Sequence, residues 1–289
     1  MDCRSRFGKS DGPSPNSVGM SERDAIDAVD EPATVATLIE DIRRLGVEPG
    51  DLLLCHSSLQ AIGWVCGDAP AVVDALMAAV TENGTVVVPT HTAQYTDPKN
   101  WSNPPVPDDW VETIRGERPA FRPAVTPTRS MGAIPECFRN YPEAVRSRHP
   151  IYSFAAWGEA AEEVVADHPF ENGLGNDSPL GRCYERDGRV LMLGTGYETN
   201  TSIHLAEYRA AIPTDTVDPT VPVCIDGEEV RVQLTDIETS TDDFPTIGAA
   251  FEDAVPSSVT TGAVGAATAT LIEQRALVDF AVDWLESNR

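Results

Sequence analysis

His204 and Glu207 are the pair of residues in this sequence whose types and spacing most clearly suit chemistry. Asn200 or Thr201 can cap a helix that begins just before them, so both residues fall in its first turns. Residues three positions apart share a helix face, and the Glu207 carboxylate can then fix the tautomer of the imidazole. The helix dipole disfavours imidazolium there, so the pair suits a general base near neutral pH. The alternative is a capping histidine beside a solvated glutamate.

Three short apolar segments, each followed by polar residues, are predicted to position this pair. The segments are residues 51–55 (DLLLC) before His56-Ser57-Ser58, residues 85–88 (TVVV) before Pro89-Thr90-His91-Thr92, and residues 189–193 (RVLML) before GTGYETNTSIH. Residues 69–80 read as a helix, which makes a β-α-β unit with parallel strands. The loops should therefore converge on one cleft at the carboxyl edge of the sheet. The loop that begins at His56 can hold phosphate oxygens through amides and hydroxyls, or it is an ordinary turn.

The rest of the chain predicts an α/β fold with a central, mostly parallel sheet and flanking helices. The segment ATVATLIEDIRRLGV has helical spacing and ends at Gly46, and residues 268–285 read as a closing amphipathic helix. Residues 214–253 predict an antiparallel excursion with a hairpin turn at Asp226-Gly227. Residues 93–128 read as a long loop over the cleft. Residues 1–31 lack periodicity and predict a disordered or loosely ordered tail, which leaves residues 32–289 as a single domain.

The composition excludes several classes of function. The net charge is −25, with 46 acidic residues against 21 basic ones, which disfavours nucleic acid and anionic membranes. No apolar run approaches the ~20 residues of a membrane span. The acidity fits either a surface that binds a polycation or a protein adapted to strong salt, and the near absence of lysine favours salt adaptation. Six scattered cysteines and no secretory signal predict a reduced, cytoplasmic protein.

Familiar signatures of metal and nucleotide sites are missing from the sequence. The five histidines form no HxxxH or HExxH pair, so we expect no metal. There is also no GxSxG nucleophile elbow, no Walker A loop and no dinucleotide-binding glycine pattern.

Several segments together resemble the aminoglycoside 3-N-acetyltransferase family, in family order and over about residues 34–285. The matching stretches are HSSLQAIGWVCGDAPAVVDAL (56–76), VVPTHT (87–92), TRSMGAIPECFR (128–139), SRHPIYSFAAWGEAA (147–161), FENGLGNDSPLGRCYERDG (170–188) and VLMLGTGYETNTSIHLAEYRA (190–210). The chain departs from the family where many relatives have two glycines in place of Cys66-Gly67. It also has His91 where an aromatic residue is commoner.

The resemblance implies transfer of acetyl from acetyl-CoA to the 3-amino group of a deoxystreptamine ring. It implies that His204 is the general base, that Glu207 supports it, and that Thr90 is a candidate oxyanion donor. It places CoA along residues carried over from the family motifs: His56, Ser57, Ser58, Thr92, Ser130, Met131 and Gly132. The partners are then CoA and a small-molecule amine. Two alternatives are a hydrolase of an amide or thioester that uses the same histidine, and a non-catalytic protein that binds CoA or an amine.

Overall fold

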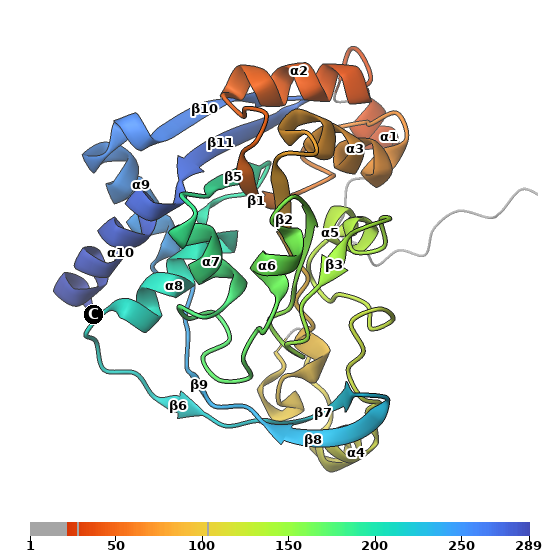
Figure 1. Cartoon of the computed structure of the whole chain (residues 1–289), viewed down its shortest axis with the longest axis vertical. Coiled ribbons are helices and arrows are strands. Elements are labelled where there is room, and N and C mark those ends of the chain that lie inside the picture. The colour runs from red at the N-terminus through yellow and green to blue at the C-terminus, as the bar shows by residue number, and fades with distance from the viewer. Residues whose placement is uncertain (1–21, 28, 103) are drawn as a thin grey trace, which may run out of the picture.

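A seven-stranded mixed sheet forms the centre of the computed structural model, which describes residues 22–27, 29–102 and 104–289 (Figure 1). Its order is β10-β11-β5-β1-β2-β4-β3, and the central strands β5 (Arg189–Leu193), β1 (Leu52–Ser57) and β2 (Thr85–Pro89) are parallel. The antiparallel outer strands are β11 (Ala267–Glu273), β10 (Val259–Val264), β4 (Phe154–Gly158) and β3 (Val145–Arg146). The central strands are nearly continuous apolar runs because helices cover both faces. The predicted α/β fold is confirmed.

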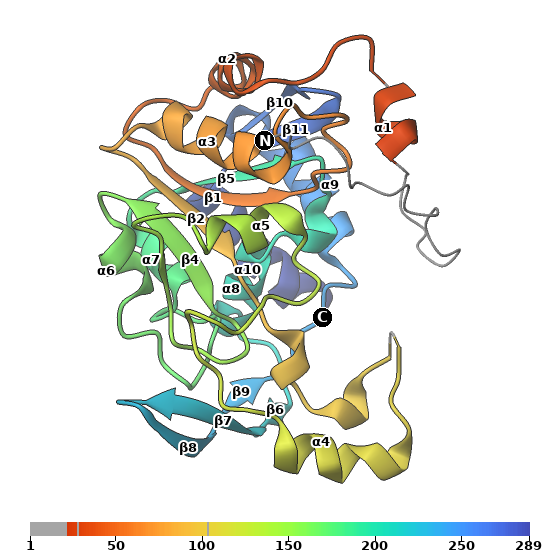
Figure 2. The same cartoon turned by 90° about the vertical axis from the view of Figure 1, so that its right-hand side faces the viewer.

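Helices pack on both faces of the sheet and enclose two apolar cores (Figure 2). One core includes α2 (Val35–Leu45), α3 (Asp68–Val80) and α5 (Ala133–Phe138). The other includes α6 (Ala161–Val165), α7 (Pro179–Glu185), α8 (Ser202–Arg209), α9 (Phe244–Ala254) and α10 (Gln274–Asn288). The predicted first helix is confirmed as α2. Thr34 caps it by accepting a hydrogen bond from the amide of Thr37, and Gly46 ends it in the left-handed conformation.

The chain differs from the prediction at both ends. Residues 268–273 belong to β11 and not to the closing helix, which begins only at Gln274. Burial along β11 largely alternates, and the strand pairs with β10 on one side and β5 on the other. Near the start, α1 (Glu22–Asp27) is a short helix with no buried residue, where a loose tail was expected. Residues 1–21 lie outside the described part of the chain. None of the described helices is both long and apolar enough to cross a membrane.

Residues 93–128 pack against the predicted hairpin and not over the cleft. The hairpin of β7 (Thr220–Ile225) and β8 (Glu228–Gln233) turns at Asp226-Gly227, as predicted, with φ values of 52° and 85°. It forms a sheet of its own, and β6 (Thr216–Val217) pairs with β9 (Asp236–Ile237) in another. The 93–128 segment contains α4 (Val111–Glu117), and the Phe121 amide donates to the Pro222 carbonyl at 2.9 Å. These contacts enclose a third small apolar cluster.

Candidate active site

Helix α8 holds His204 in its first turn, as the spacing predicts. The Asn200 side-chain oxygen accepts a hydrogen bond from the Ser202 amide at 3.0 Å, which satisfies one free amide at the helix start. One turn further on, Glu207 lies 2.6 Å from His204, measured from Oε2 to Nδ1. The imidazole also meets the ring of Phe244 edge-on, with the ring centroids 4.8 Å apart. Both contacts restrict rotation of the imidazole.

Glu207 is a buried carboxylate with a complete set of donors. Its side chain is only 1% exposed, and Oε1 accepts from Arg289 Nη1 at 2.5 Å and from the Ser240 amide at 3.2 Å. Burial alone would raise the pKa of Glu207. The hydrogen bonds from His204, Arg289 and Ser240 outweigh burial, so its pKa lies below the usual range. An ionised Glu207 accepts the Nδ1 proton of His204, and Nε2 is then the ring nitrogen left for a ligand.

A cavity of about 1070 Å³ opens beside His204 at the carboxyl edge of the parallel strands. This volume lies at the upper end of the range for small-molecule sites. The predicted convergence of the loops after β1 and β5 is confirmed. Of the residues assigned to CoA or catalysis from sequence, the cavity wall includes His56, Ser57, Ser58, Ser130, Met131, Gly132 and His204.

The cavity offers neutral donors instead of basic side chains. Ser57 Oγ and Thr195 Oγ1 belong to wall residues, are buried and have no hydrogen-bond partner in the described part of the chain. The N-terminus of α3, a helix of 13 residues, reaches the wall at Gly67 and Asp68. Its free amides can bind an anion. Among the described wall residues, Glu22, Asp68 and Glu198 are acidic and none is lysine or arginine.

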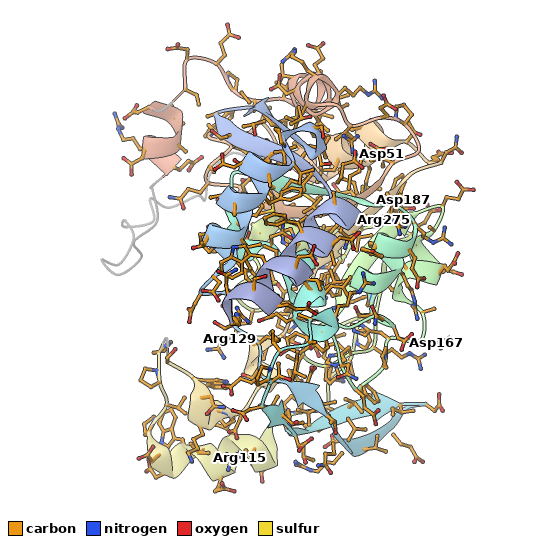
Figure 3. The ribbon with its side chains drawn as sticks, turned by 90° about the vertical axis from the view of Figure 1, so that its left-hand side faces the viewer. Asp51, Arg115, Arg129, Asp167, Asp187 and Arg275 are labelled. Atoms are coloured by element: carbon orange, nitrogen blue, oxygen red, sulfur yellow. The ribbon has the colours of Figure 1, made fainter. Side chains whose placement is uncertain are left out.

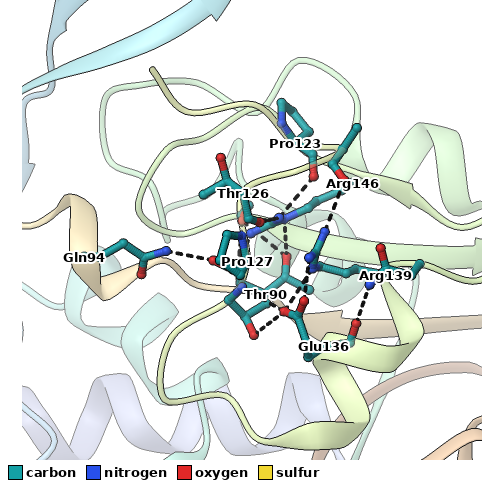
Figure 4. Close-up of polar contacts among 12 residues, drawn as sticks. Thr90, Gln94, Pro123, Thr126, Pro127, Glu136, Arg139 and Arg146 are labelled. Atoms are coloured by element: carbon teal, nitrogen blue, oxygen red, sulfur yellow. Dashed lines mark hydrogen bonds and ion pairs between the residues drawn. The ribbon is translucent and has the colours of Figure 1, made fainter. Parts of the chain in front are cut away.

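Thr90 and Thr92 do not line this cavity, although the sequence analysis assigned them to the site. Both residues are fully buried. Thr90 Oγ1 accepts from Arg146 Nε at 3.1 Å, and the Thr90 carbonyl accepts from Ser153 Oγ at 2.8 Å and from Arg146 Nη2 at 2.7 Å (Figure 4). The Thr92 hydroxyl donates to the Pro150 carbonyl. The threonine side chains thus tie the loop after β2 to its neighbours, and Pro89 is the residue of that segment that reaches the wall.

Four other histidines are held neutral inside the protein. Burial, and next the nearby His204, lower the pKa of His56 to about 3, and its Nε2 lies 3.3 Å from Thr201 Oγ1. Burial also lowers the pKa of His91 to about 3 and of His168 to about 4, and takes the pKa of His149 well below its usual value. His149 Nδ1 accepts hydrogen bonds from the backbone amides of Ile151 and Tyr152, which is a structural role.

Metal and cysteine chemistry find no support in the described residues. In residues 22–27, 29–102 and 104–289, no group of three histidine, cysteine or acidic side chains could hold a metal ion. Cys55 lines the cavity, but burial raises the pKa of its thiol to about 12. A thiol with that pKa is protonated near neutral pH and is a poor nucleophile.

Sequence reasoning missed three residues of the site. Thr195 and Thr201 line the cavity, and both lie in the loop after β5 that was already noted for its hydroxyl groups. Arg289 contacts Glu207 across 82 positions of the chain. No local pattern indicates that contact, because it depends on how α10 packs against α8.

The cavity lies at the carboxyl edge of an α/β sheet, and His204 on its wall is oriented by the buried carboxylate of Glu207, an arrangement typical of enzyme active sites. Residues 54–286 match the profile of a family described as aminoglycoside 3-N-acetyltransferase. The chain belongs to this aminoglycoside 3-N-acetyltransferase family and is an acyltransferase.

Relatives and solved structures cover nearly the whole chain. It is 43% identical over 259 residues to the SPbeta prophage-derived aminoglycoside N(3')-acetyltransferase-like protein YokD of Bacillus subtilis strain 168, covering 89% of this chain and 94% of that one. The crystal structure of YokD has a TM-score of 0.88 and covers 92% of this chain and 98% of its own. Aminoglycoside N(3)-acetyltransferase VII of Streptomyces paromomycinus is 37% identical over 280 residues, which is 92% of this chain and 96% of that one. The binary complex of AAC-IIIb with CoASH has a TM-score of 0.80 at 30% identity, covering 89% and 97%.

Proposed function

We propose that this protein transfers the acetyl group of acetyl-CoA to an amino group of an aminoglycoside or a related amine. In an aminoglycoside the acceptor is the 3-amino group of the deoxystreptamine ring. His204 acts as the general base. The observation that carries the proposal is the 2.6 Å contact between Nδ1 of His204, which lies on the cavity wall, and the buried Glu207 behind it. It orients the imidazole with Nε2 free to meet a substrate.

The chemistry needs a base because an amine is mostly protonated near pH 7. His204 takes the proton from the amine nitrogen, and the freed lone pair attacks the thioester carbonyl. The C–N bond forms and the thioester C–S bond breaks. The proton passes from His204 to the leaving thiolate, and the acylated nitrogen releases its second proton to solvent. Glu207 stabilises the transient imidazolium. Donors for the oxyanion would be the hydroxyls of Ser57 and Thr195, which are buried without partners. Thr90, the donor that the resemblance suggested, does not line the cavity and donates its hydroxyl to Ser153 Oγ at 3.2 Å.

CoA would lie along the wall formed by Ser57, Ser58 and residues 130–132. A solved relative, AAC-IIIb, is a binary complex with CoASH, and this supports CoA as the co-substrate. Since no described wall residue is lysine or arginine, backbone amides at the start of α3 and hydroxyl groups would hold the phosphates. Binding of CoA would thus depend on the fixed dipoles of backbone amides more than on flexible lysine or arginine side chains.

Thiol release from acetyl-CoA tests the proposal, with a panel of aminoglycosides and simple amines and mass spectrometry of the product. We expect release that depends on the amine, with a product heavier by one acetyl group. His204→Gln should lower kcat about 10²–10⁴-fold, the usual contribution of general base catalysis, with little change in acetyl-CoA affinity. Near-normal turnover of a folded His204→Gln protein would contradict the assignment.

The same assay separates the two alternative functions. Release without any amine would indicate a hydrolase that uses water as the nucleophile. Binding of acetyl-CoA with no release for any amine would favour a non-catalytic binding protein. The pairing of His204 with an ionised, buried Glu207 favours an enzyme over a binding protein, because binding alone does not need a base.

A further inference from the structure

Arg289, the last residue of the sequence, contacts the carboxylate that orients His204. Its Nη1 lies 2.5 Å from Glu207 Oε1, while the other carboxylate oxygen lies 2.6 Å from His204 Nδ1. A single buried carboxylate therefore joins the guanidinium to the imidazole. Arg289 lies beyond residues 54–286, the part of the chain that matches the family profile.

The guanidinium is fixed at three points. Besides Glu207, it donates from Nε to Asp243 at 2.7 Å and from Nη2 to the Ser240 carbonyl at 3.1 Å. Its side chain is 22% exposed, and Glu207 is 1% exposed. The contacts tie the end of α10 to α8 and to the loop before α9. The Ser240 amide also donates to Glu207 Oε1, the oxygen that Arg289 contacts. Arg289 and Ser240, the two donors to that oxygen, are therefore also bonded to each other.

We infer that Arg289 is a positioning residue for the acetyl transfer, which holds Glu207 in register with His204 and shares the charge of that carboxylate. The positive charge of the guanidinium opposes a second positive charge on the imidazole. The planar guanidinium of Arg289 also keeps the Glu207 carboxylate in one orientation. The ammonium group of a lysine at the same position would fix that orientation less well. The inference rests on the proposed function.

Other charged groups near the pair remain in place when Arg289 changes. Three groups interact electrostatically with His204: His56 on β1, Asp236 on β9 and His91 after β2. A fourth group, Asp243, lies before α9 and pairs with Arg289. Because each of these groups is common to the wild type and to an Arg289 variant, a difference in pH profile between the two reports on Arg289.

The test compares kcat/KM against pH, with one acceptor amine, for Arg289→Gln, Arg289→Lys and a matched control, Arg275→Gln. Arg275 pairs with the exposed Asp187 at 2.6 Å (Figure 3). It lies at the start of α10, at the opposite end of the helix from Arg289. Titration of the acceptor amine is the same in every profile and cancels from the comparison. Thermal unfolding confirms that each variant is folded.

We expect Arg289→Gln to move the pH of half-maximal kcat/KM on the acid side upward by about one unit, and to lower kcat about tenfold. Arg289→Lys should keep the wild-type midpoint, because it keeps the charge, with a smaller loss of kcat. Arg275→Gln should match the wild type. A folded Arg289→Gln protein with an unmoved midpoint would overturn the inference. If His204→Gln retained full activity in the same assay, the proposed function itself would fail.

Discussion

Four buried histidines make the stability of this protein steeply dependent on pH below about 6. Burial holds the pKa of His56 and His91 to about 3 and of His168 to about 4, and it takes the pKa of His149 well below its usual value. In the unfolded chain each titrates near 6.5. At pH 5 the unfolded state therefore binds about four more protons than the folded state at these sites, so stability rises with pH and falls on acidification.

The expected slope is about 5 kcal/mol of unfolding free energy for each pH unit near pH 5, since one proton contributes about 1.4 kcal/mol per unit. A typical domain has only about 5–15 kcal/mol in total, so acid unfolding should occur between about pH 5 and pH 4. Carboxylates with lowered pKa, such as Glu207 and Glu136, add to the loss only below about pH 4.5. The window from pH 6.5 to 4.5 thus reports mainly on the histidines.

His91→Phe tests this reasoning directly. The ring of His91 lies edge-on to Tyr152 and Phe154, at 5.6 and 5.2 Å between centroids, and its buried Nε2 has no partner in the described part of the chain. A phenyl ring keeps the packing and removes one of the four proton-binding groups. Urea unfolding followed by tryptophan fluorescence at several pH values should give a slope smaller by about 1.4 kcal/mol per pH unit. An unchanged slope, or a wild type equally stable at pH 7 and pH 5, would refute the argument.

Two further predictions concern packing and charge. Gly181→Ala should lower the free energy of unfolding by about 3 kcal/mol, because the added Cβ would collide with the Asn176 carbonyl. Gly116→Ala on α4 has open space around the added Cβ and should raise the free energy of unfolding by up to ~1 kcal/mol. Urea titration of both variants measures the difference. The net charge of −25 predicts loss of folded structure when molar KCl is diluted to millimolar levels, and unchanged circular dichroism across that range would contradict adaptation to salt.

Local patterns of the sequence were enough to predict the parallel centre of the fold and the pairing of His204 with Glu207. The strands β1, β2 and β5 are short apolar runs, and His204 and Glu207 are three positions apart on one helix. Both signals have a short period and depend on neighbours in the chain, so sequence alone determines them. The hairpin turn at Asp226-Gly227 was predicted for the same reason, because its positive φ values favour those residue types.

Tertiary packing decided the features that have no local period. Residues 268–273 have composition compatible with a helix, yet they form β11 because β5 and β10 pair with them. Thr90 has the right residue type for a donor, but its hydroxyl is turned inward and bonded to Arg146. Arg289 reaches Glu207 only because α10 packs against α8, 82 positions away in the chain. Sequence thus determined which chemistry is available, and the folded chain decided which side chains meet to perform it.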